Sequence, residues 1–193
     1  MAVTKKITMQ GDVFEGISSV FALANGLPDS LDVSSSNLQE FPVSDDSGFN
    51  FDTGQPSIEH FKVKGLNTDW VNPFTPGDGE ITLEIPCNNT DILELCGFVG
   101  TAANVTLPSG LAAGGTAATG KSYPVTQKAV YLGLLILNDT EDKLLFIKKG
   151  KFMAQIIFDG SNKPLCVVLT GTIAAGAATD AFGICEIAAA DNG

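Results

Sequence analysis

The chain contains no arginine and only one histidine. Its eleven cationic side chains are all lysines, against 22 Asp and Glu residues, so the formal net charge at pH 7 is −11. Arginine is the usual side chain for two-point recognition of phosphates and of guanine edges. All nucleic-acid binding also gains from cations that displace counterions from phosphates. Sequence-specific binding to nucleic acid is therefore not expected. A protein of this composition can lie beside DNA only if its role does not require binding the DNA.

The sequence offers few residues for catalysis. His60 is the only histidine, so any Ser–His–Asp or Cys–His arrangement would have to include it. It shares the polar side of a predicted strand with Lys62 and Lys64, where an exposed polar side chain is the simpler interpretation. The acidic pairs at 45–46 and 141–142 fall in predicted turns, where such side chains are usually solvated. We predict no catalytic and no cofactor-binding residue, and we interpret the chain as not an enzyme.

The cysteines form no CxxC pair, and a structural zinc site needs four suitably spaced ligands. Three of them lie in apolar runs, where a reduced, buried thiol behaves as a small hydrophobic side chain. We therefore predict no metal site. The four cysteines are Cys87, Cys96, Cys166 and Cys185.

Long apolar segments are missing as well. The N-terminal stretch MAVTKKITMQGDVFE has no continuous apolar region of the kind found in secretory signals. The longest apolar run, residues 129–137, is too short to span a bilayer. We expect no membrane partner. Without a signal peptide, the glycosylation-like triplets at Asn88, Asn104 and Asn138 are interpreted as chance matches.

The pattern that is present is that of many short strands in one domain spanning residues 1–193. Residues 80–85 alternate most clearly, with Ile81, Leu83 and Ile85 expected to face inward. Lys-Gly-Lys at 149–151 is interpreted as a hairpin connection. The other predicted strands are 3–9, 12–23, 38–43, 48–52, 57–65, 129–137, 144–149, 152–158, 165–173 and 182–187, and a second hairpin connection is predicted at 159–162.

One short helix is predicted at residues 91–96. Asp91 followed by Glu94 resembles a capping box, and Gly97 suits the position just after the helix. Ile92, Leu95 and Val99 are expected to face the sheet. Many strands with one helix indicate a mainly β fold, an antiparallel β-sandwich or barrel with one short flanking α-helix.

Two segments are predicted to be mobile loops. Residues 25–36 have the composition of a loop. Residues 101–120 consist mostly of Ala, Gly and Thr, which provide little side chain to pack.

A match to the nucleotide-binding P-loop pattern lies at residues 115–122, and residues 156–159 resemble the acidic strand that accompanies it. A true P-loop joins a buried strand to a helix. Here the preceding residues are LPSGLAAG, and Pro124 falls where the helix would begin. Nucleotide binding is therefore the less favoured interpretation.

The element order from 45 to 97 resembles the major tail proteins of long-tailed, non-contractile phages. The likeness rests on GFNFDTGQPSIEHFKVKG, a loop, GDGEITLEIPC and the helix DILELCG. Later stretches, KFMAQIIFDGSNKPLCVVLTGT and DAFGICEI, fit the terminal strands of that family. The likeness covers the larger part of the chain and is one of pattern, without a signature motif. The segments 25–36 and 101–120 are not part of it.

The resemblance implies a tail-tube fold and a structural role. In the family, subunits form hexameric rings whose strands close a β-barrel around a channel, and stacked rings make the tube through which the genome passes. The related tubes of contractile tails and type VI secretion share the fold. The chain is thus expected in the virion tail, and in the host cytoplasm during assembly. Its partners are copies of itself and other tail proteins, and DNA passes without specific binding.

The charge balance agrees with such a channel, because an acidic wall repels phosphates. A net charge of −11 equally serves to keep a small protein soluble. The alternative function is a β-sandwich binding or adhesion module, which would need clustered aromatic side chains. The chain has one Trp and two Tyr, which counts against it.

Overall fold

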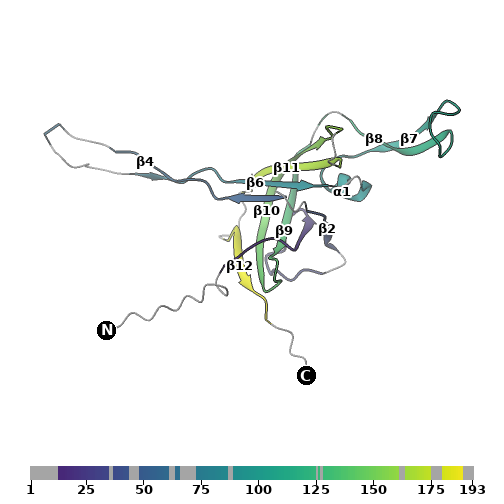
Figure 1. The fold of residues 1–193 in the computed structure, drawn as a ribbon. Coiled ribbons are helices and arrows are strands. Elements are labelled where there is room, and N and C mark those ends of the chain that lie inside the picture. The colour runs from purple at the N-terminus through teal and green to yellow at the C-terminus, as the bar shows by residue number, and fades with distance from the viewer. Residues whose placement is uncertain are drawn as a thin grey trace, which may run out of the picture.

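The computed structural model describes residues 13–34, 37–43, 48–60, 64–65, 73–86, 89–124, 126, 128–160, 164–174 and 180–188. These residues form antiparallel strands and one short helix (Figure 1), which confirms the predicted fold class. The elements are β1 (Ser19–Ala24), β2 (Gln39–Phe41), β3 (Phe49–Asp52), β4 (Ser57–Ile58), β5 (Phe74–Thr75), β6 (Glu80–Ile85), α1 (Thr90–Leu95), β7 (Thr101–Thr106), β8 (Ala117–Ser122), β9 (Val130–Leu137), β10 (Lys143–Ile157), β11 (Cys166–Ile173) and β12 (Phe182–Glu186).

The central sheet has the strand order β2-β1-β9-β10-β11-β6-β3, and β12 also pairs with β10. The first part of β10 lies beside β12 and its second part beside β11, so β10 belongs to both halves of the sheet. Figure 1 shows β6 and β11 running crosswise to β9 and β10. The described strands do not close into a barrel, and the two halves pack together as in a sandwich.

The hairpin predicted at 149–151 is wrong, because β10 runs through this segment as one strand. The register against β9 shifts between Ile147 and Gly150, which marks a bulge. Gly150 is buried, and a Cβ atom there would lie 2.3 Å from the ring of Phe152. The glycine therefore makes room for a core aromatic ring and does not mark a turn.

The hydrophobic core fills the space between the two halves of the sheet and beneath α1. Residues 80–85 alternate as predicted, and Ile81, Leu83 and Ile85 are fully buried. Burying side chains of this size stabilises a fold by roughly 1.5–3 kcal/mol each. Phe51 of β3 and Phe182 of β12 meet edge to face, with ring centroids 5.1 Å apart, and so link the two halves of the sheet.

Helix α1 forms where it was predicted, with Ile92 buried and Leu95 packed partly against the core as expected, but its cap and the position of Val99 differ. Asn89 is the N-cap residue and accepts a hydrogen bond from the Asp91 amide at 2.8 Å, so the predicted capping box is wrong. The helix ends in a Schellman turn: Gly97 has a φ of 92°, and the Phe98 amide donates to the Leu93 carbonyl. This turn folds Phe98 back onto the core and leaves Val99 61% exposed, contrary to the prediction.

Other predicted strands are found with shifted ends. The strand predicted at 12–23 begins only at Ser19, and the one predicted at 57–65 is limited to β4 among the described residues. The strand predicted at 3–9 lies outside the described residues. The loop 25–36 contains no strand or helix in its described part, as predicted, and its mobility remains a prediction.

Two hairpins project from the core in opposite directions (Figure 1). The first, the β4–β5 arm, continues the pair β3–β6 outward. The second, the β7–β8 arm, comes from the segment 101–120, so the prediction of a loop is wrong for residues 101–106 and 117–120 and is confirmed for residues 107–116. Ala, Gly and Thr pair here through backbone hydrogen bonds over six registered positions, which needs no bulky side chain.

Candidate assembly surface

The structure describes only part of the chemical motifs considered in the sequence analysis. His60 is exposed just beyond β4, and the pair 45–46 lies outside the described residues. Within the described part of the chain, no group of three or more His, Cys, Asp or Glu side chains is placed to hold a metal ion. No helix there is long and apolar enough to cross a bilayer.

The cysteines behave only partly as predicted. Cys96 and Cys166 are buried, whereas Cys185 is exposed. The prediction of a buried thiol is wrong for Cys185, which lies on β12, a strand with no fully buried residue and with β10 as its one partner in the described structure. Cys87 lies outside the described residues.

The P-loop-like segment 115–122 has the wrong geometry for phosphate binding. Residues 117–122 are strand β8, which pairs with β7, and no helix follows. The ammonium of Lys121 forms an ion pair with Glu94 of α1. This hydrogen bond to the Glu94 carboxylate raises the pKa of Lys121. The lysine thus ties the base of the β7–β8 arm to the helix.

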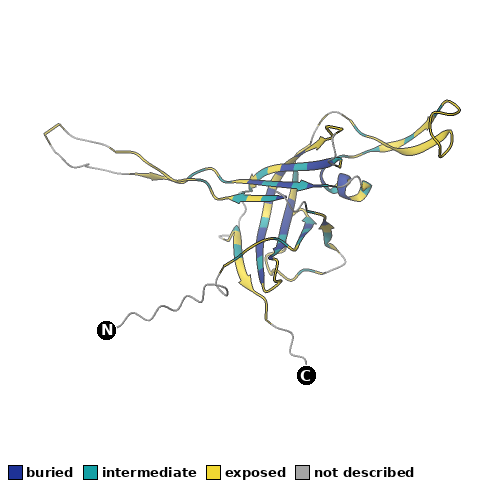
Figure 2. Ribbon diagram, viewed as in Figure 1, coloured by how far each residue is buried: buried dark blue, intermediate teal, exposed yellow. Residues whose placement is uncertain are grey.

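The described residues of the two arms have almost no buried side chains, and Figure 2 colours them mostly yellow. Every residue of β8 is exposed, as is every residue of β7 except Ala103. In the β4–β5 arm, Ile58 and Phe74 lie directly opposite each other and are 46% and 70% exposed. A two-stranded hairpin without a packed face is only marginally stable in water. Both arms therefore present surface that a second molecule would stabilise.

The β7–β8 arm is nevertheless firmly attached at its base. The rings of Phe98 and Tyr123 meet edge to face, with centroids 6.2 Å apart. A Cβ atom on Gly100 would lie 2.7 Å from the Tyr123 ring, so the chain passes close beneath it. In the sequence, one aromatic residue stands on each side of the Ala/Gly/Thr segment. This signal for the contact between Phe98 and Tyr123 was missed in the sequence analysis.

A broad polar surface, here named the outer face, covers the half of the sheet formed by β9, β10, β11, β6 and β3. Along these strands, buried apolar residues alternate with exposed or half-buried residues on the other side. Such alternation is typical of a sheet with one face in the core and one in water. The outer face consists of Tyr131, Lys149, Lys151, Met153, Gln155, Val168, Thr170, Thr172, Glu80, Thr82, Glu84, Asn50 and Asp52.

The outer face does not have the character of a sugar-binding surface. Sugar recognition by stacking needs neighbouring aromatic rings. Among the residues of the outer face, only Tyr131 is aromatic, and the Lys149 ammonium lies 4.9 Å from the centroid of its ring. The remaining exposed aromatic residues of the described chain come from other elements, namely Phe74, Phe158 and Phe182.

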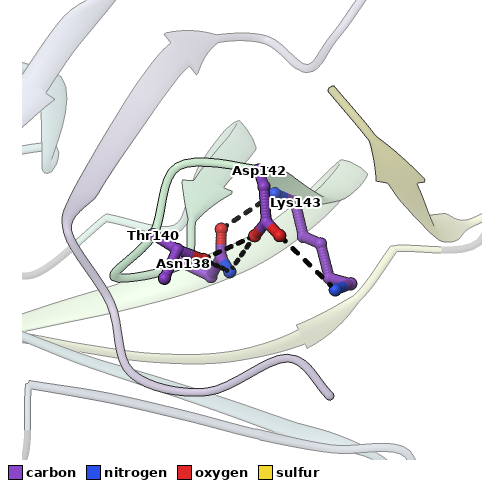
Figure 3. Close-up of polar contacts among 4 residues, drawn as sticks. All are labelled: Asn138, Thr140, Asp142 and Lys143. Atoms are coloured by element: carbon purple, nitrogen blue, oxygen red, sulfur yellow. Dashed lines mark hydrogen bonds and ion pairs between the residues drawn. The ribbon is translucent and has the colours of Figure 1, made fainter. Parts of the chain in front are cut away.

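The turn between β9 and β10 is held by a small polar network (Figure 3). Asn138 is only 2% exposed, and its side-chain oxygen accepts from the Lys143 amide at 2.8 Å. Its side-chain nitrogen donates to Thr140 at 2.8 Å and to Asp142 at 2.6 Å. Hydrogen bonds from Thr140 and then Asn138 lower the pKa of Asp142. This burial makes Asn138 a structural residue and explains its place in a turn.

Removing the Asn138 side chain should destabilise the subunit. In Asn138→Ala, the buried Lys143 amide loses its side-chain acceptor, and we expect a loss of about 1–3 kcal/mol in the free energy of unfolding. Urea titration measures this. Asn104→Ala, the same change on the exposed β7 strand, should cost less than about 0.5 kcal/mol. Equal effects of the two substitutions would contradict the assigned role of Asn138.

The same network predicts a pH dependence with a definite sign. Because the pKa of Asp142 is lowered in the folded protein, its ionised form stabilises the fold above the ordinary value of 3.8. That stabilisation is lost as the pH falls from 3.8 through the lower folded value. Asp142→Asn should therefore show a weaker loss of stability in this acidic range than the unaltered protein.

Comparison with known proteins adds no assignment. No protein-family description matches the sequence, and no curated protein matches it. Function must therefore be argued from the surfaces described above.

Proposed function

We propose that this chain is the structural subunit of a phage tail tube, which assembles with copies of itself into hexameric rings. The rings stack into a tube in the virion tail, and other tail proteins join its ends. The subunit has no enzymatic role, and DNA passes through the tube without specific binding. Assembly takes place in the host cytoplasm.

The pair of exposed arms is the observation that carries this proposal. They leave a small core in opposite directions, and the described strands of both arms bury no hydrophobic face of their own. Ordering each arm costs conformational entropy. In a subunit that functions alone, no contact would offset this cost. Contacts with neighbouring copies would offset that cost, and opposite arms suit a subunit with neighbours on more than one side.

The outer face fits the wall of a channel. Its side chains are hydroxyl, amide and charged groups in the main, and the chain as a whole carries a net charge of −11. The outer face has two lysines against three carboxylates, Asp52, Glu80 and Glu84. A wall of this kind stays hydrated and holds phosphates weakly, because tight binding requires many clustered cations. Free passage of DNA is what a tail tube needs.

Self-association at rising concentration tests the proposal. We expect mass photometry and sedimentation of the purified protein to show discrete ring-sized oligomers and larger stacks that grow with concentration. The reason is that arm surface becomes buried only between copies. Persistence of the single 20.1-kDa subunit up to the solubility limit would refute the proposal.

A further inference from the structure

One row of side chains crosses the outer face from β9 to β3. Residues directly opposite each other on neighbouring strands point to the same side of a sheet. The row begins with an aromatic and a basic residue, passes a threonine, and ends with two acidic residues. Its members are Tyr131, Lys151, Thr172, Glu80 and Asp52, joined by the pairs Tyr131–Lys151, Lys151–Thr172 and Glu80–Asp52 and by continuation of the pair Gly171–Ile81.

The outer face therefore has charges of opposite sign at its two ends. Lys149 and Lys151 lie on β10 at the opposite end of the outer face, here named the basic end, and both are exposed. This end is not an open strand edge, because β9 pairs there with β1. Asp52 and Glu80 lie at the β3–β6 edge and are also exposed. Three strand spacings of about 4.8 Å separate Lys151 from Asp52, roughly 14 Å in all. Two spacings, about 10 Å, separate Lys151 from Glu80. Both separations exceed the screening length of about 8 Å at physiological salt, so the attraction between the two ends within one subunit is weakened.

The acidic edge carries an unfavourable pair. Asp52 and Glu80 are directly opposite on β3 and β6, and like charges in this position repel each other. Among the described residues, none of the ion pairs involves Asp52, Glu80, Lys149 or Lys151. In addition, β3 is the last strand of the sheet, so its outer edge is open in the described structure. A cationic surface placed beside β3 would relieve this repulsion.

We propose that the β3 edge of one copy docks against the basic end of the outer face of a second copy, with Asp52 and Glu80 facing Lys149 and Lys151. The contact rests on the self-assembly proposed above and specifies its side-by-side interface. Two different patches meet, so the association is head to tail and closes into a ring when the rotation permits. Exposed ion pairs contribute little affinity. Their role here is to set the register and to exclude wrong pairings.

Charge exchange tests this contact. The basic-end variant carries Lys149→Glu and Lys151→Glu, and the acidic-edge variant carries Asp52→Lys and Glu80→Lys. Each places like charges across the contact, and we expect at least a tenfold rise in the concentration needed for oligomers in mass photometry. The fourfold variant, which combines all four substitutions, restores opposite charges and the original net charge. It should assemble like the unaltered protein, as should a mixture of the two twofold variants.

The control variants distinguish the effect of the position of the charges on assembly from the effects of net charge and of misfolding. Asp32→Lys with Glu40→Lys makes the same charge change as the acidic-edge variant at exposed residues away from the outer face, and should assemble normally. Circular dichroism and thermal unfolding establish that each variant is folded. Normal assembly of the twofold variants, or a folded fourfold variant as defective as they are, would overturn the contact while leaving self-assembly intact. Failure of the unaltered protein to assemble would overturn the tube proposal and this contact together.

Discussion

Shortening the β7–β8 arm is expected to abolish assembly and to leave the subunit folded. In the variant, residues 103–120 are replaced by Asn-Gly, a pair that favours the tight turn of a two-residue hairpin. The removed residues contribute none of the buried core side chains. The free energy of unfolding should therefore change by less than about 1 kcal/mol, the range of surface changes. Oligomers should be absent at tenfold the concentration at which the full-length protein forms them.

A length-matched variant shows whether the arm acts through its sequence. Here the same residues are replaced by a Gly/Ser segment of equal length, which keeps the chain but removes the ladder between β7 and β8. This variant should also fail to assemble, because a flexible segment loses more entropy on docking than a formed hairpin does. Assembly by the shortened protein at the normal concentration would show that the β7–β8 arm has no part in the contacts between copies.

Gly171→Val is expected to cause the largest loss of stability from a single substitution. A Cβ atom at Gly171 would lie 2.2 Å from the Lys151 carbonyl oxygen and 2.7 Å from the Phe152 ring. Both neighbours belong to β10, the strand shared by the two halves of the sheet, so they have little room to move. Overpacking of this kind costs about 3 kcal/mol or more, and thermal and urea unfolding measure it.

The chain offers a matched control in another strand. Gly120 lies on β8, and a Cβ atom there would meet no atom within 4 Å. Gly120→Val should therefore change the stability of the subunit by less than about 0.5 kcal/mol. If Gly171→Val proved as mild as Gly120→Val, the close packing of β11 on β10 would be wrong.

Much of the fold was predictable from local patterns. The alternation at 80–85, the apolar run at 129–137 and the short helix before Gly97 each carry their own signal, and the structure has elements at all three places. The errors arose where one local pattern has two explanations. Lys-Gly-Lys at 149–151 suggests a turn, yet here the glycine makes space for Phe152, which only the packed core reveals.

The candidate surface was harder to predict than the fold. The Ala, Gly and Thr residues of 101–120 have weak preferences, so their pairing as a hairpin depends on register and not on side chains. The two charged ends of the outer face come from distant parts of the chain: Asp52 and Glu80 form one end, and Lys149 and Lys151 form the other. Each residue is visible in the sequence, but their shared row follows only from the order and register of β9, β10, β11, β6 and β3.

Negative-stain electron microscopy of the concentrated protein tests the central claim most directly. The account predicts rings of uniform diameter with a stain-filled central hole, together with short stacks of such rings. The diameter should be the same in every stack, because one lateral contact sets it. Uniform particles of single-subunit size, or irregular clusters without a hole, would contradict the account.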